Sequence, residues 1–455
     1  MDKKNRYFLI ISLCVFIFLT ILNPAKSNAA GVSLIRDAEI EDFLYDLTKP
    51  IFKAANLNPD NIKIYIVNDS TLNAFVTGGQ NVFINTGLIV KYCDPNVLVG
   101  VIAHETGHIA SGHIARSSEA MTNAGNAMLL SYIAGIAAAA TSHPDAGMAI
   151  IMGGSQIANR VALKFTRSQE EASDLLALRY LKATGNSAHG LLEILEFFES
   201  EEAEYKDKID EYALTHPVSK KRINFIKANA KNFPKHDDVA LKKRLERIIA
   251  KLNGFLDEPD QILKTYNKDN QNNKYARVIA YYKKGKTNEA ILILNDLIKL
   301  DPKDGYLYDL KGQILSESGD QKNAIIAYNQ AVKLNKNNNL ARIALANSII
   351  DLDSGDKKII DFAIKNLLTA LKTEKADTNV YKQLAKAYDQ NHDLGRSYLA
   401  LAQMGLAEES LEKTKKYIKL ARENLDKSDK IDLLLLDDIE QFSQKLKEKN
   451  NLDYL

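Results

Sequence analysis

Apolar and polar positions follow two different periods in the first half of the chain. Residues 62–67 alternate between apolar and polar side chains, as a half-buried β-strand does, and residues 73–87 predict a β-hairpin that turns at Gly78 and Gly79. Between residues 172 and 180, apolar side chains recur instead with the spacing of an amphipathic helix. The first half is therefore predicted to combine a small β-sheet with helices.

The second half of the chain is predicted to consist of helical repeats. The segment 281–302 recurs as 319–335, with matching residues 34 positions apart, which is the tetratricopeptide period. The matching pairs are Gly285 and Gly319, Ala290 and Ala324, and Leu300 and Leu334. Weaker copies follow at 355–376 and 381–421. Because each helix pair buries its apolar face only by stacking on its neighbours, the repeats predict a curved solenoid with a concave surface for peptides or partner proteins.

The patterns give one fold class for the whole chain. We expect a mainly helical α+β protein, in which a domain with a small β-sheet precedes an α-helical tetratricopeptide solenoid. The predicted divisions are a targeting segment at 1–29, a first domain at 30–251, an Asn-, Asp- and Lys-rich linker at 252–272, repeats at 273–425 and a C-terminal helical segment at 426–455.

The N-terminus resembles a secretory signal peptide in its build. Basic residues precede an apolar run at 7–22, and Ser27 and Ala29 supply the small side chains that signal peptidases need. Cleavage after Ala29 would leave a soluble exported chain, whereas a retained segment would act as a membrane anchor. The exported chain would hold one cysteine, Cys93, and so no internal disulfide. We expect Cys93 to be a small buried side chain.

The net charge and a second apolar stretch bear on whether the chain binds nucleic acid or a membrane. The 60 basic and 58 acidic residues give a net charge of +2, which argues against a nucleic-acid-binding surface. Residues 120–161 are rich in Ala, Gly, Met and Ile, but the uninterrupted part is shorter than the about 20 residues that cross a bilayer. We expect a buried or lid-like pair of helices there, and peripheral contact with the outer membrane stays open.

Residues 104–108 read H-E-T-G-H and carry the clearest chemical signal in the chain. The surrounding stretch 101–111 predicts a helix, on which residues four apart share a face. His104 and His108 can therefore bind one Zn²⁺, and Glu105 can reach a water on that ion. This layout is typical of a zinc peptidase with one zinc ion per chain.

A catalytic zinc ion takes three protein ligands and leaves its fourth position to water, so a third ligand must come from elsewhere. The metzincin pattern would need a histidine six residues after His108, but that residue is Ile114. A carboxylate is the alternative. Glu170 and Asp174 are four apart on the second predicted helix, so one can bind zinc while the other accepts the distal ring N–H of a ligand histidine. Glu171 is the main rival for the ligand position.

These motifs together resemble the gluzincin peptidases that include HtpX and the CAAX prenyl proteases. In that family, H-E-x-x-H is followed by an E-x-x-A-D helix that an arginine often precedes. The resemblance places the third zinc ligand on Glu170, a supporting carboxylate on Asp174 and the preceding arginine on Arg167. Ser173 stands where the family has alanine. His113 also matches the family, but on a continuous helix it would point about 140° away from the second ligand histidine, as a structural histidine would.

A third matching segment covers residues 214–223. From the residues alone it could be a turn with a surface histidine. The resemblance places a histidine near the cleft on His216 and a following arginine on Arg222, and either group could stabilise an oxyanion opposite the zinc ion. We also hypothesise that His216 occupies the fourth zinc position in a resting state. In the same family, an edge strand beside the cleft pairs with an extended substrate.

The order of signal peptide, gluzincin motifs and repeats resembles that of the beta-barrel assembly-enhancing proteases of Gram-negative bacteria. The resemblance implies a periplasmic zinc endopeptidase and chaperone that acts on unfolded or misassembled outer-membrane proteins. It also implies contact with the barrel-assembly machinery through the repeats. The expected mechanism has zinc on His104, His108 and Glu170 polarising a water that Glu105 deprotonates. The alternative is a non-catalytic repeat scaffold with a structural zinc site, in which Glu105 would have no use.

Overall fold

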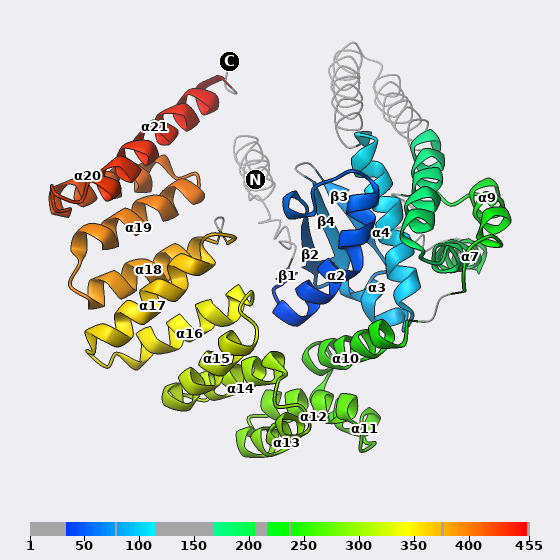
Figure 1. Ribbon diagram of the computed structural model, residues 1–455, viewed down its shortest axis with the longest axis horizontal. Coiled ribbons are helices and arrows are strands. Elements are labelled where there is room, and N and C mark those ends of the chain that lie inside the picture. The colour runs from blue at the N-terminus through cyan, green and yellow to red at the C-terminus, as the bar shows by residue number, and fades with distance from the viewer. Residues whose placement is uncertain are drawn as a thin grey trace, which may run out of the picture.

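The computed structural model describes most of the chain on both sides of the predicted domain boundary (Figure 1). The described residues are 33–77, 80–113, 167–204, 216–235, 238–374 and 377–452. The predicted signal peptide, the turn at residues 78–79 and the apolar insert at 120–161 lie outside them. Within the described residues, no helix is both long enough and apolar enough to cross a bilayer.

A small mixed sheet forms near the N-terminus, as predicted. Its strands are β1 (Leu34–Ile35), β2 (Lys63–Val67), β3 (Ala74–Thr77) and β4 (Asn81–Asn85), in the order β1-β2-β4-β3. Strands β3 and β4 pair antiparallel with Thr77 opposite Asn81, which confirms the hairpin, and β2 pairs parallel with β4. Strand β3 therefore lies at one edge of the sheet.

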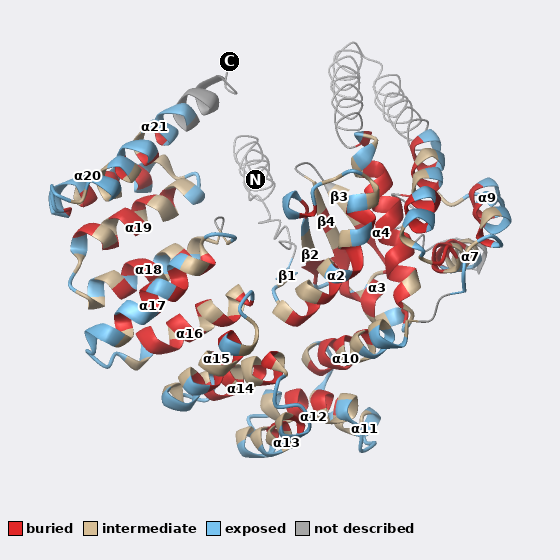
Figure 2. Cartoon of the chain, viewed as in Figure 1, coloured by how far each residue is buried: buried red, intermediate tan, exposed pale blue. Residues whose placement is uncertain are grey.

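Two helices enclose the core beside this sheet. Helix α2 (Ala38–Ala54) begins at Asp37, whose side chain accepts a hydrogen bond from the backbone N–H of Ile40. Helix α4 (Pro95–Ala110) follows α3 (Thr86–Lys91) and is buried on every side from Val97 to His108. A helix that is buried all round lies in the centre of its domain. Figure 2 shows α4 as a continuous buried stretch.

The remaining helices of the first domain lie on one another and on α4. They are the helix of residues 167–184, α7 (His189–Glu204), α9 (Lys220–Ala230) and α10 (Val239–Leu256). Helices α7 and α10 lie against α4, and α9 lies against α7. The predicted second amphipathic helix is thus confirmed at 167–184. The predicted linker at 252–272 instead contains the end of α10 and the short helix α11 (Pro259–Thr265), and α11 packs on the next helix of the chain.

Helix pairs make up the rest of the chain, and they follow an arc that begins beside α10 and ends at α21 (Figure 1). The pairs begin with α12 (Gln271–Lys283) and α13 (Thr287–Leu300), then α14 (Gly305–Glu317) and α15 (Gln321–Leu334). The others are α16 (Asn339–Leu352), α17 (Lys357–Ala370), α18 (Thr378–Gln390), α19 (Leu394–Ala407), α20 (Leu411–Asn424) and α21 (Lys430–Leu452). The predicted mainly helical α+β fold with a solenoid is confirmed.

Buried charges join the first domain to the repeats. Lys251 on α10 places its Nζ 2.5 Å from Asp37 Oδ2 and 3.1 Å from Glu39 Oε2. Tyr275 on α12 donates a hydrogen bond of 2.9 Å to the same Glu39 oxygen. Arg247 on α10 pairs with Glu39 as well, at 2.6 Å. Because an unpaired buried charge is strongly unfavourable, this network favours one placement of the two parts.

The prediction that Cys93 is buried is wrong. The residue is exposed, in the short connection between α3 and α4, and its Sγ lies 3.9 Å from Glu246 Oε1. Connections between helices run along the surface, where their backbone groups can reach water. The low polarity of the side chain therefore did not decide its position.

Candidate metal centre

His104 and His108 share one face of α4, and their Nε2 atoms lie 3.1 Å apart. His104 is fully buried and His108 nearly so, in a helix that has no polar face of its own. Two ring nitrogens that converge at this distance within an apolar helix need a common partner. The predicted juxtaposition of the two histidines is present in the structure.

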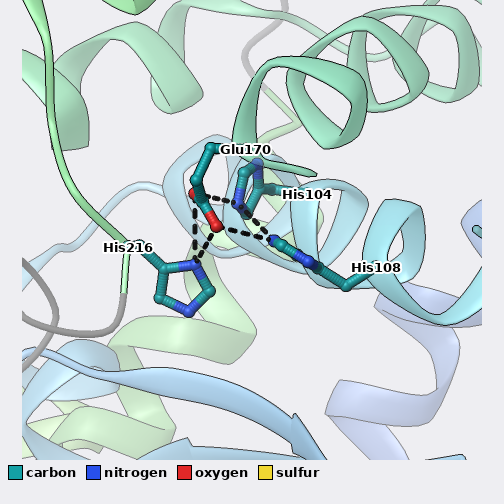
Figure 3. A group of neighbouring side chains, drawn as sticks. All are labelled: His104, His108, Glu170 and His216. Atoms are coloured by element: carbon teal, nitrogen blue, oxygen red, sulfur yellow. Dashed lines mark hydrogen bonds and ion pairs between the residues drawn. The ribbon is translucent and has the colours of Figure 1, made fainter. Parts of the chain in front are cut away.

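Glu170 faces both histidines from the helix of residues 167–184 (Figure 3). Its Oε2 lies 3.1 Å from His104 Nε2, and its Oε1 lies 3.1 Å from His108 Nε2. In a tetrahedral zinc site with bonds of about 2.1 Å, neighbouring ligand atoms lie about 3.4 Å apart. The three side chains are therefore spaced as ligands of one ion are.

His216 completes the group from the loop that precedes α9. Its Nδ1 lies 3.2 Å from Glu170 Oε1 and 3.3 Å from Glu170 Oε2. One ligand atom from each of His104, His108, Glu170 and His216 lies within 4.8 Å of the others, and all four residues are buried. Three imidazoles and one carboxylate form a donor set that suits zinc.

Glu105 lies beside this group and is completely buried. Neither of its carboxylate oxygens accepts a hydrogen bond from the residues that the structure describes. His216 Nε2 is 3.5 Å from its Oε1. A buried carboxylate without donors is costly unless a ligand or a water supplies them, so its position fits a general base beside a metal ion.

The structure separates the rival carboxylates clearly. Glu171 is exposed, and both of its oxygens accept hydrogen bonds of 2.8 Å from Lys221 Nζ. Arg167 is exposed as well, at the start of its described helix. Of the two adjacent glutamates, Glu170 therefore lies with the histidines and Glu171 at the surface.

Asp174 lies behind His104. Its Oδ1 is 2.9 Å from His104 Nδ1, the ring nitrogen that points away from Glu170. Arg222 on α9 donates to both Asp174 oxygens, at 2.7 Å from Nε and 2.9 Å from Nη2. Burial would raise the pKa of Asp174, but these contacts with Arg222 and His104 lower it. Asp174 is thus held as an anion that orients the His104 ring.

Arg222 is buried and held on three sides. Besides Asp174 it places Nη1 2.9 Å from Glu170 Oε2 and donates to the carbonyl oxygen of Pro217 at 3.0 Å. Its guanidinium therefore holds the two carboxylates in place. The contact that the sequence predicted between Arg222 and a developing oxyanion stays a prediction.

The charges of the site compensate one another. Burial alone would lower the pKa of His104, but Glu170 and Asp174 raise it to about 10. Burial would raise the pKa of Glu170, and its histidine neighbours hold it well below the usual range. The carboxylate of Glu170 is therefore ionised at neutral pH, as a metal ligand must be.

His113 does not point away from the ligands as a continuous helix would require. Helix α4 ends at Ala110, and Gly112 adopts a left-handed conformation with φ of 63°. This turn brings His113 back toward the site, so that its Nδ1 lies 3.1 Å from His108 Nδ1. The predicted direction was wrong because Gly112 breaks the helix, and a glycine just past a helix end is the signal for such a turn.

Gly107 determines how closely the second helix approaches α4. A Cβ atom at this position would lie 2.9 Å from the Cα and 3.0 Å from the carbonyl oxygen of Ser173. Only glycine permits this contact of backbones. The approach places Glu170 and Asp174 within reach of His104.

Comparisons with known proteins agree with this geometry. The profile described as Peptidase family M48 matches residues 36–230, and the tetratricopeptide-repeat profile matches 274–304 and 306–338. A beta-barrel assembly-enhancing protease of Yersinia pestis is 24% identical over 333 residues, covering 71% of this chain and 68% of the relative. A putative one of Vibrio cholerae is 25% identical, covering 61% of this chain and 58% of the relative.

Among solved structures, the tetratricopeptide protein YrrB covers 43% of this chain at 18% identity with a TM-score of 0.32. In this chain the match to the peptidase profile precedes the matches to the repeat profile. Residues 36–230 therefore resemble peptidase family M48, and with its relatives this match makes the chain a metalloendopeptidase with tetratricopeptide repeats on its C-terminal side.

Proposed function

We propose that this chain is a zinc endopeptidase whose metal ligands are His104, His108 and Glu170. The observation that carries the proposal is the convergence of these three side chains beside Glu105, a buried carboxylate to which no described residue donates a hydrogen bond. A bound zinc ion would polarise the scissile carbonyl and lower the pKa of the attacking water. A metal with only a structural role would have no use for Glu105.

The residues around the metal position would transfer the proton and hold the ligands in place. Glu105 removes the proton from the attacking water and later passes it to the leaving amine. Asp174 keeps the His104 ring in its ligating orientation, and Arg222 fixes Asp174 and Glu170 together. Burial of the whole group excludes bulk water, which strengthens each of these electrostatic contacts.

The substrates and location follow from the relatives and from the sequence. We propose that the enzyme acts in the periplasm on unfolded or misassembled outer-membrane proteins, because its relatives carry the name of beta-barrel assembly-enhancing proteases. The N-terminal sequence supports export. The repeats would then hold polypeptide partners, including the barrel-assembly machinery, since stacked helix pairs present extended surfaces for this purpose.

The test compares Glu105→Gln with the wild type on an unfolded outer-membrane protein. The substitution keeps the size of the side chain but removes the base, so cleavage should fall by at least about a hundredfold. Zinc content, measured by atomic absorption, should stay near one ion per chain. Unchanged cleavage by a zinc-loaded Glu105→Gln variant would contradict the mechanism.

We also propose that His216 occupies the fourth metal position in the resting enzyme. It already lies 3.2 Å from Glu170 Oε1, and its loop leads directly into α9. His216→Ala should therefore raise basal cleavage, because water would reach the metal without displacing an imidazole. X-ray absorption on the zinc-loaded wild type should show three imidazole ligands. Two imidazoles with a water ligand, together with lower cleavage by the variant, would rule out self-ligation.

A further inference from the structure

His113 lies where a metal-ligating histidine normally finds the acceptor for its second ring N–H, the hydrogen bond that orients its ring. It is buried, and its Nδ1 lies 3.1 Å from Nδ1 of His108, the ring nitrogen opposite the one that faces Glu170. We infer that His113 is a positioning residue for zinc binding, which holds the His108 ring through a neutral imidazole. This inference rests on the proposed zinc peptidase site.

The placement of protons in this pair follows from the geometry. Two ring nitrogens at 3.1 Å can share one hydrogen, so one donates and the other accepts. His108 Nε2 must keep its lone pair for the metal, which puts the hydrogen of His108 on Nδ1. His113 Nδ1 is therefore the acceptor, and the hydrogen of the His113 ring lies on Nε2.

Ser173 supports the same arrangement. Its Oγ lies 3.4 Å from His113 Nδ1, at the hydrogen-bonding limit, so its hydroxyl can share the lone pair of this nitrogen with His108 only as the weaker of two donors. This serine stands where the resembling family has alanine. The contact exists because Gly107 lets the two helices approach at Ser173.

The two ligand histidines consequently have different supports. His104 is backed by the ionised carboxylate of Asp174, whereas His108 is backed by a neutral ring. A carboxylate makes its imidazole a stronger donor than a neutral acceptor does. The His113 contact therefore controls mainly the direction of the His108 ring, and Asp174 also strengthens the His104 ligand.

The decisive experiment measures zinc affinity of the full chain by competition with a chelator. His113→Ala should weaken zinc binding about ten- to a hundredfold, the usual effect of losing such a support. His113→Asn places an amide oxygen near the position of the lost Nδ1, so it should recover most of the affinity. His189→Ala, which removes a histidine at the start of α7, should bind zinc as the wild type does.

Other measurements separate positioning from general destabilisation. The metal-free His113→Ala and His113→Asn variants should unfold at similar temperatures, while their cobalt-substituted forms should differ in the visible spectrum. Nitrogen-15 spectra of the zinc-loaded protein should place the His113 proton on Nε2. Equal zinc affinities for wild type, His113→Ala and His113→Asn would overturn the inference, and so would a proton on His113 Nδ1. If the wild type binds zinc and cleaves substrate, either of these results refutes only the inference about His113. If the wild type binds no zinc, the proposed function is refuted as well.

Discussion

At the scale of single residues, the partner behind each side chain decides what that side chain can do. Glu170 and Glu171 are adjacent and chemically identical, yet one contacts three histidines and the other contacts Lys221 at the surface. The difference arises because neighbouring residues on a helix point about 100° apart. Position on the helix thus gives the same residue type two roles, a proposed metal ligand at Glu170 and a solvated ion pair at Glu171.

This difference gives a matched pair of variants. Glu170→Gln should lose most of its zinc and its cleavage activity, because a neutral amide is a poor ligand and removes the negative charge that faces both histidines. Glu171→Gln should keep both, since it removes only an exposed ion pair worth at most about 1 kcal/mol. Zinc content and peptide cleavage of the two purified variants check the expectation. The reverse result would move the ligand to Glu171.

Relations between residues on one helix could be predicted from their spacing, whereas contacts between different helices could not. His104, Glu105 and His108 were predictable because the helical period alone fixes their relation. The sequence could not choose between Glu170 and Glu171 without the family resemblance, since the choice depends on how the second helix is rotated. The contact of His113 was missed because it depends on the left-handed turn at Gly112.

At the scale of elements, the crossing of α4 with the helix of residues 167–184 sets the geometry of the site. At the crossing, the backbones of Gly107 and Ser173 lie so close that a Cβ at residue 107 would come within 2.9 Å of the Ser173 Cα. Because interiors are packed as densely as crystals, added volume at this point has nowhere to go. The helices must then move apart, and the ligands they carry move with them.

Gly107→Ala tests this view of the crossing. Alanine favours a helix over glycine by about 1 kcal/mol, but overpacking against a backbone usually costs about 1–3 kcal/mol. We expect net destabilisation and weaker zinc binding, measured by urea unfolding and chelator competition. Gly100→Ala is the control, because its Cβ would meet Leu191 of α7 at 2.7 Å, away from the metal ligands. Similar zinc affinities for both variants would contradict the role given to the Gly107 crossing.

The sequence predicted the helices and strands of the two halves better than it predicted the segment that joins them. The strands, the hairpin and the repeated helix pairs follow from periods of two, 3.6 and 34 residues, which persist over many positions. The stretch 252–272 was predicted as a linker from its polar composition, but its helix α11 packs against α12. The polar residues that dominate the composition of this segment lie on the exposed face of the helix. They give no sign that Ile262 is buried on its other face.

At the scale of the whole molecule, the first domain and the repeats behave as joined parts because charged groups are buried between them. Asp309 on α14 lies near this junction, where Lys251, Asp37 and Glu39 act on it electrostatically. Burial raises the pKa of Asp309 from 3.8 to about 6. The carboxyl is therefore half-ionised in the folded protein at a pH where the unfolded chain has already lost its proton.

The raised pKa of Asp309 determines in which direction the stability of the folded protein changes with pH. A raised pKa in the folded state stabilises the protein below about pH 4, and this stabilisation is lost as the pH rises through about 6, by up to about 3 kcal/mol. Asp309→Asn, which cannot ionise, should remove this part of the pH dependence. Urea unfolding of wild type and variant at pH 4.5, 5.5 and 7 should show the variant gaining stability relative to wild type with rising pH. A constant difference across the three pH values would contradict the assignment.

The separation of the ligands along the chain has a consequence for how the enzyme matures. Glu170 follows His104 by 66 residues, and His216 follows Glu170 by 46. No short piece of the chain holds the proposed ligand set, so a metal bound by all of these residues would be captured only after their segments have packed together. A copy that is half-made, in transit or partly degraded would therefore lack the complete metal centre and could not cleave proteins.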